Sequence, residues 1–126
     1  MTLTNIDPDA DEIDLLLKVQ GNGWQDGCIE VWYQPRRGTV KVMTYTPGRR
    51  GWVQQGADLP VTFQNGDVFG AKARADGSVE VYKNGALVGS RDARSWAFTG
   101  RGGKVGLWTI NGTGVLLNDF AGGNLV

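Results

Sequence analysis

The sequence contains no histidine and only one cysteine among its 126 residues. The absence of imidazole excludes Ser-His-Asp triads, Cys-His pairs and histidine-ligated zinc sites. A single cysteine cannot form a disulfide within the chain, and Cys28 lies in an apolar stretch, where we expect a small core residue. An enzyme built on this chain would therefore depend on carboxylates, or on Lys or Tyr.

The chain also lacks an excess of charge and a long apolar run. Thirteen Lys and Arg balance thirteen Asp and Glu, so the formal net charge is zero. Phosphate-rich partners require an excess of cations, which argues against nucleic acid and anionic membranes. No apolar run approaches the roughly 20 residues that a membrane-spanning helix needs.

Glycine and strand-forming residues are abundant instead. The chain has 20 glycines, about twice the usual share of about 7%, and they separate short runs rich in Val, Trp, Tyr and Phe. No run of twelve residues has an uninterrupted helical apolar period, so we expect almost no helix. Eight runs are typical of strands: residues 12–20, 28–34, 39–45, 67–75, 78–83, 86–91, 104–110 and 114–120.

Turn residues between these runs indicate antiparallel pairing. Asn84-Gly85 is typical of a type I′ hairpin turn, which needs positive φ at both central residues. Asp76-Gly77, Asn111-Gly112 and the run at residues 35–38 predict further hairpins. The sequence therefore predicts a single all-β domain over residues 1–126, an antiparallel β-sandwich.

Alternation along three of the runs predicts one apolar face and one mixed face, since successive strand residues point to opposite sides. The apolar face would carry Ile13, Leu15, Leu17, Val19, Ile29, Val31, Tyr33, Val40, Val42 and Thr44. The opposite face would carry Glu12, Asp14, Leu16, Lys18, Gln20, Cys28, Glu30, Trp32, Gln34, Lys41, Met43 and Tyr45.

Large aromatic side chains on a solvent-facing sheet indicate a binding surface. Sugar rings present apolar C–H faces that stack on Trp32 and Tyr45, and hydroxyls that pair with carboxylates and amides. The alternative is that both rings are core residues beneath a loop. Trp24 and Trp52 are either rim platforms for the ligand or covers over a core edge, whereas Trp96 and Trp108, flanked by apolar residues, are expected in the core.

The acidic residues allow two interpretations. Asp7, Asp9 and Asp11 alternate as in a calcium loop, yet the glycine and the bidentate Glu of that motif are missing, which favours a solvated turn. Glu12 and Asp14, alternate residues of one strand, would both face a bound sugar. A carboxylate pair about 5–5.5 Å apart supports retaining glycoside hydrolysis.

Glu12-Ile13-Asp14 is similar to the start of the catalytic strand of laminarinase-type glucanases. Those enzymes have a further Glu three residues after the Asp, where this chain has Leu17. The required acid/base is therefore missing, and Glu30 on the neighbouring strand is the only replacement.

Residues 66–92 (GDVFGAKARADGSVEVYKNGALVGSRD) and 102–123 (GGKVGLWTINGTGVLLNDFAGG) resemble the closing strands of the concanavalin A-like lectin/glucanase superfamily. The resemblance covers roughly residues 60–122 and implies a sandwich of jelly-roll type. It also implies a possible structural calcium ion at Asp119; we otherwise expect no cofactor. Domains of this type are longer, so either a partner chain completes the sandwich or the sequence is an engineered or natural minimal form; we expect a homodimer or higher oligomer.

These observations together predict a non-catalytic carbohydrate-binding module, extracellular or secreted, with its signal absent from this sequence. Trp32 and Tyr45 would stack on sugar rings, with Trp24 or Trp52 at the rim. Hydrogen bonds to hydroxyls would come from Glu30, Gln34, Lys41, Asp14 and Lys18. Two alternatives remain: a glycoside hydrolase or polysaccharide lyase that uses Glu12, Asp14 and Glu30, and a structural or adhesion module whose aromatic face contacts protein.

Overall fold

The computed structural model describes residues 1–48, 51–110, 116–118 and 121–123. No α-helix occurs in these residues, as predicted, and one 3-10 turn, η1 (Trp24–Asp26), stands between strands. The strands are β1 (Thr2–Thr4), β2 (Glu12–Val19), β3 (Cys28–Gln34), β4 (Thr39–Thr46), β5 (Gly51–Gln54), β6 (Leu59–Pro60), β7 (Phe69–Ala73), β8 (Ser78–Lys83), β9 (Ala86–Asp92), β10 (Lys104–Ile110) and β11 (Leu116–Asn118). Within the described residues, no helix has the length and apolar character needed to cross a membrane.

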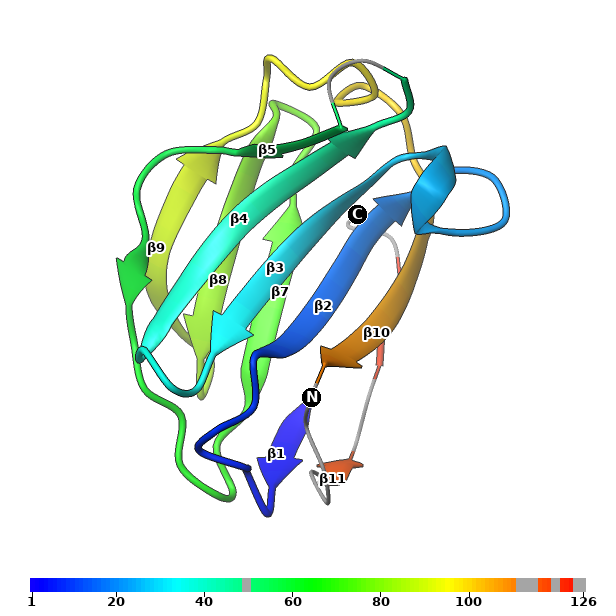
Figure 1. Ribbon diagram of the computed structural model, residues 1–126. Helices are drawn as coiled ribbons and strands as arrows, with labels where there is room; N and C mark the ends of the chain where they lie inside the picture. The colour runs from blue at the N-terminus through cyan, green and yellow to red at the C-terminus, as the bar shows by residue number, and fades with distance from the viewer. Residues whose placement is uncertain (49–50, 111–115, 119–120, 124–126) are drawn as a thin grey trace.

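Two antiparallel sheets form the layers of a sandwich, which confirms the predicted fold class. The larger sheet has the order β10-β2-β3-β4-β5, with β6 paired to β4, and the smaller has the order β7-β8-β9. Figure 1 shows the larger sheet lying across the front of the smaller one. β1 pairs with β11 and forms a bridge to Val68, just before β7. The jelly-roll type and completion by a partner chain stay predictions.

The predicted hairpin turns position neighbouring strands. Residues 35–38 connect β3 to β4 at the pair Gln34↔Thr39. Asn84 and Gly85 connect β8 to β9 with φ values of 53° and 79°, both positive as a type I′ turn requires. The turn at Asn111-Gly112 lies outside the described residues.

The hydrophobic core lies between the sheets and confirms most of the predicted apolar face. Apolar side chains of β2, β3 and β4 pack there against side chains of β7 and β8, and Tyr33 contributes its ring from the middle of the sheet. The Tyr33 hydroxyl accepts a hydrogen bond from the backbone N–H of Phe63 at 3.0 Å, which satisfies a buried polar group. The opposite surface of the larger sheet is hereafter called the outer face.

A bulge at the end of β2 changes which residues face outward. The register between β2 and β10 shifts between Lys104 and Gly106, and Lys18 has a φ of 48°. An extra residue in one strand reverses the alternation beyond it. Val19 therefore packs with Leu16 and Cys28 on the outer face, so the prediction that Val19 faces the core is wrong.

Candidate functional site

The outer face carries most of the residues that the alternation placed opposite the core; Lys18 is an exception. Strand pairing arranges them in three cross-strand rows: Trp108–Asp14–Trp32, Gly106–Leu16–Glu30–Met43 and Cys28–Tyr45–Trp52. Each row crosses at least three strands, so residues distant in sequence become neighbours. The registry of the sheet thus assembles aromatic rings and carboxylates in one place.

A cleft of about 410 Å³ opens on this face. We call it the tryptophan cleft, and its lining consists of Glu12, Trp24, Glu30, Trp32, Met43, Trp52, Trp108 and Ile110. A volume of this size lies in the range typical of small-molecule sites, about 300–1,000 Å³. Four indole rings and two carboxylates are the chemical groups that a ligand would meet.

Trp24 lies at the centre of the aromatic group. Its ring stacks on Trp52, with centroids 5.6 Å apart and an interplanar angle of 22°. It also contacts Tyr45 and Trp108 edge to face, at centroid distances of 5.0 and 5.4 Å. The loop that carries η1 therefore holds an indole against three rings from β4, β5 and β10.

Trp32 lies on the outer face and lines the cleft. Its indole N–H donates to the backbone carbonyl of Asp11 at 3.0 Å, which fixes the ring. The ammonium of Lys41 lies 5.9 Å from the ring centroid. A fixed, half-buried indole is suited to stacking on a flat apolar ligand surface.

Several predicted contact residues lie elsewhere. Tyr45 is half-buried beside Trp24 and Trp52, where it supports their rings without lining the cleft. Lys41 donates to both carboxylate oxygens of Asp58, at 2.9 and 3.1 Å. Gln34 accepts a hydrogen bond from Thr39 at 3.3 Å and, like Lys41, is not part of the cleft lining.

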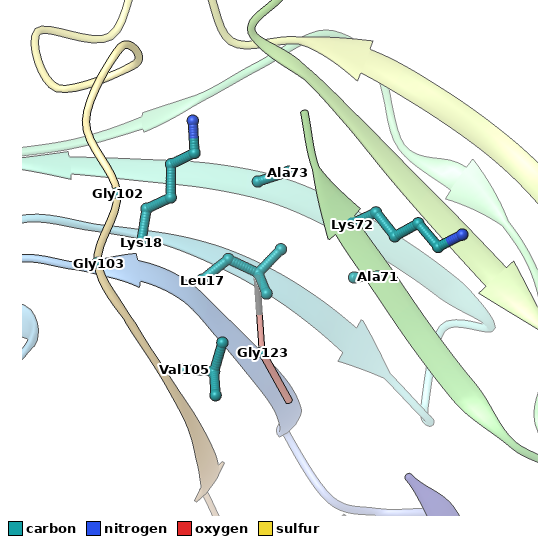
Figure 2. A pocket seen from close by; sticks show the side chains of 9 residues that line it. All are labelled: Leu17, Lys18, Ala71, Lys72, Ala73, Gly102, Gly103, Val105 and Gly123. Atoms are coloured by element: carbon teal, nitrogen blue, oxygen red, sulfur yellow. The ribbon is translucent and has the colours of Figure 1, made fainter. Parts of the chain in front are cut away.

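Lys18 does not belong to the outer-face site, contrary to our expectation. The bulge turns it away, and its ammonium donates to the backbone carbonyl of Thr99 at 2.6 Å. It instead lines a second cleft of about 120 Å³ between β2, β7 and β10, which also contains Lys72. Figure 2 shows Lys18 beside Leu17 and Val105, while the side chain of Lys72 extends away from them on β7.

Three carboxylates form the acidic part of the candidate site. Glu12, Asp14 and Glu30 each offer an oxygen atom within 4.8 Å of the others. Asp14 is fully buried beneath the face, Glu30 is 6% exposed and Glu12 is half-buried. The sequence-predicted alternative set of carboxylates is therefore brought together.

Burial changes the acidity of this group. Desolvation raises the pKa of Asp14 far above its usual range, and the adjacent Glu30 and Glu12 carboxylates raise it further. Desolvation also raises the pKa of Glu30, although its hydrogen bond with Asp14 opposes the rise. Asp14 therefore holds a proton at neutral pH and donates it toward Glu30.

Cys28 is fully buried beside this acidic group, as expected. Burial, followed by the charge of Glu30, raises the pKa of its thiol to about 12. The thiolate is the nucleophilic form, so this thiol is inert at neutral pH. Cys28 acts as packing beneath the aromatic rings.

Two of the remaining tryptophans test the core assignment. Trp96 is 3% exposed and belongs to the main core, as predicted. Trp108 was also expected in the core, but it is half-buried on the outer face and lines the cleft. Both faces of residues 104–110 carry apolar side chains, so alternation gave no signal for Trp108.

The acidic residues that were considered as calcium ligands lie in separate parts of the chain. Asp7 accepts a hydrogen bond from the backbone N–H of Asp9 at 2.9 Å, which is the local turn that the sequence favoured. Glu12 and Asp14 lie beyond this turn, in β2. Asp119 lies outside the described residues.

A scan against protein-family models, a search of curated proteins and a search of solved structures each found no match to the chain. The resemblance to the concanavalin A-like superfamily therefore stays a prediction.

Proposed function

We propose that the protein binds a saccharide in the tryptophan cleft. The observation that supports this most directly is the combination of four indoles with Glu12 and Glu30 around about 410 Å³. Indole faces stack on the C–H faces of sugar rings, while the carboxylates accept hydrogen bonds from hydroxyls. A phosphate or nucleic acid would meet acidic groups here and no compensating cation in the lining.

Each residue has a distinct part in this proposal. Trp32 and Trp108 flank Asp14 in one row and provide stacking surfaces. Trp52, which is 37% exposed, provides a stacking surface at the edge of the cleft, and the ring of Trp24 packs against it. Because sugar hydroxyls exchange water contacts for protein contacts, the net gain per hydrogen bond is about 0.5–1.5 kcal/mol, so stacking carries much of the affinity.

Calorimetric titration with β-glucan, xylan and galactan oligosaccharides tests this function. We expect binding to one class and at least a tenfold weaker affinity in Trp52→Ala, whose partly exposed ring is removable without unfolding. Tyr82→Ala is the matched control, because Tyr82 lies half-buried on the smaller sheet and carries Lys72 over its ring. Absence of binding to all three classes by the folded protein contradicts the proposal.

Glycoside hydrolysis is a second candidate, favoured by the approach of Glu12, Asp14 and Glu30 within 4.8 Å. A raised pKa suits Glu30 to proton donation at the leaving oxygen, and Glu12 is the more accessible candidate nucleophile. Release of new reducing ends, abolished by Glu30→Gln and retained by Asp58→Asn, supports hydrolysis. Binding without any product assigns the cleft to recognition alone.

A further inference from the structure

The acidic group at the tryptophan cleft, formed by Glu12, Asp14 and Glu30, has no compensating positive charge beside it. Asp14 is 0% exposed, and among the described residues no N–H or O–H group donates a hydrogen bond to either of its carboxylate oxygens, so its one hydrogen bond is the proton that it donates toward Glu30. The oxygens nearest to it in this group belong to Glu12 and Glu30, which are also acceptors. Across residues 1–48 and 51–110, no Lys or Arg forms an ion pair with any of these three carboxylates.

The one lysine in the same row of the sheet is already engaged. Lys41 pairs across strands with Trp32, but its ammonium lies 2.9 Å from Asp58. A buried carboxylate without a donor or a countercharge is strongly unfavourable. In the ligand-free protein, a proton on Asp14 removes part of this unfavourable electrostatic energy. A bound cation would remove more of it.

The walls of the cleft favour the same kind of ligand. The faces of Trp24, Trp32, Trp52 and Trp108 carry the negative part of the ring quadrupole, which attracts cations. An ammonium group with N–H donors suits carboxylate acceptors better than a quaternary ammonium, which has no hydrogen to donate. The rings beside the carboxylates provide the apolar surface on which a pyranose stacks.

We propose that the ligand is a saccharide with free amino groups, a hexosamine glycan whose ammonium binds between Glu12 and Glu30 in the tryptophan cleft. This inference rests on the proposed saccharide binding and names the class of sugar. Asp14 lies behind the two glutamates and keeps Glu30 oriented through its shared proton. The ammonium supplies the positive charge that the described residues of the cleft lack.

Three β-1,4-linked oligosaccharides of equal length test the inference: oligomers of glucosamine, of N-acetylglucosamine and of glucose. Titrations followed by tryptophan fluorescence are made at about pH 6, below the pKa of about 7.7–8.0 of a peptide α-amino group, the protein amine most similar to the amino group of a sugar. We expect the glucosamine oligomer to bind at least tenfold more tightly than the other two. We also expect Glu30→Gln to lose this preference while it retains weak binding of the glucose oligomer.

Glu80→Gln is the matched control, because Glu80 lies on the smaller sheet and pairs with Arg74. If Glu30→Gln does not fold, Glu12→Gln, at a half-buried position, gives the same readout. Equal affinity for all three oligomers overturns the inference and leaves saccharide binding intact. No binding of any oligomer overturns the inference, and it overturns saccharide binding as well if xylan and galactan oligosaccharides also fail to bind. A fluorescence response to CaCl₂ alone that abolishes the preference assigns the carboxylates to a metal and also overturns the inference.

Discussion

Asp14 is the residue on which the electrostatics of the site depend. It occupies the centre of a cross-strand row between Trp108 and Trp32, fully buried and without a donor to its oxygens. Its neighbours Glu12 and Glu30 add like charge. Ionisation of Asp14 at this position lowers the free energy of unfolding of the ligand-free protein. Buried ionisable groups with a shifted pKa are concentrated at functional sites.

The pH dependence of stability tests this description of Asp14. A carboxyl whose pKa is raised on folding binds more protons in the folded than in the unfolded state above about pH 4. The free energy of unfolding should therefore fall as pH rises from about 5 to 8, by up to about 1.4 kcal/mol per pH unit for one proton. Urea unfolding at several pH values measures this slope.

Asp14→Asn should flatten the slope and stabilise the protein at about pH 8, since an amide needs no proton to be neutral. Asp58→Asn is the control, because Lys41 and Gln54 lower the pKa of Asp58 and its titration lies below this pH window. Equal slopes in the parent protein and Asp14→Asn would show that Asp14 is ionised in the folded protein.

At the scale of elements, β2, β3 and β4 were predictable from the sequence, whereas β5, η1 and the bulge in β2 were not. Alternation in residues 28–34 and 39–45 gave both faces correctly, because every second residue of β3 and β4 packs into the core between the sheets. β5 and η1 are too short to have a period, although they carry Trp52 and Trp24. The bulge at Lys18 could not be predicted from the sequence, because it depends on the pairing of β2 with β10.

The same limit applies to the site. The alternation in residues 28–34 predicted that Glu30 and Trp32 lie on the same face. Their proximity to Glu12 and Asp14 follows from the pairing of β2 with β3. Trp108 was missed because its place in the row depends on the position of β10 next to β2, a pairing between residues almost a hundred positions apart. Sequence patterns identify faces well, but they do not give the order of strands.

The contact between η1 and β5 has a measurable energy. Trp24 and Trp52 stack with ring centroids 5.6 Å apart, and η1 has no buried residue, so this aromatic packing contributes to its position beside the hydrogen bonds of its loop. A double-mutant cycle with Trp24→Ala, Trp52→Ala and the double variant should give a coupling of about 0.5–1.5 kcal/mol in the free energy of unfolding.

The cycle of Trp24 with Tyr82, which lies on the other sheet, is the control and should show additivity. Additivity within error for Trp24 and Trp52 would mean that the η1 loop is held by its backbone instead of by the ring contact.

At the scale of the whole molecule, the larger sheet is only partly covered by the smaller one. Val105 and Leu107 of β10 are each 38% exposed, and Val68 is 41% exposed. Exposed apolar groups beside open sheet edges favour association with another chain. This is the physical basis of the predicted homo-oligomer.

Light scattering over a range of protein concentrations measures the association directly. We expect a mass of at least twice the 13.6 kDa of one chain. A constant mass of one chain up to high concentration would contradict the prediction and leave the saccharide site unaffected, since that site is built within a single chain.

The two faces of β2, β3 and β4 separate residues that stabilise the fold from residues that line the cleft, which is useful for protein engineering. Along β3, the odd-numbered positions hold the sandwich together, whereas Glu30 and Trp32 line the cleft and Cys28 is buried beneath the aromatic rings. A combinatorial library that randomises Glu30, Trp32 and Met43 would therefore sample new selectivities on an unchanged scaffold. Deleting one residue from the middle of β3 would do the reverse and exchange the two surfaces.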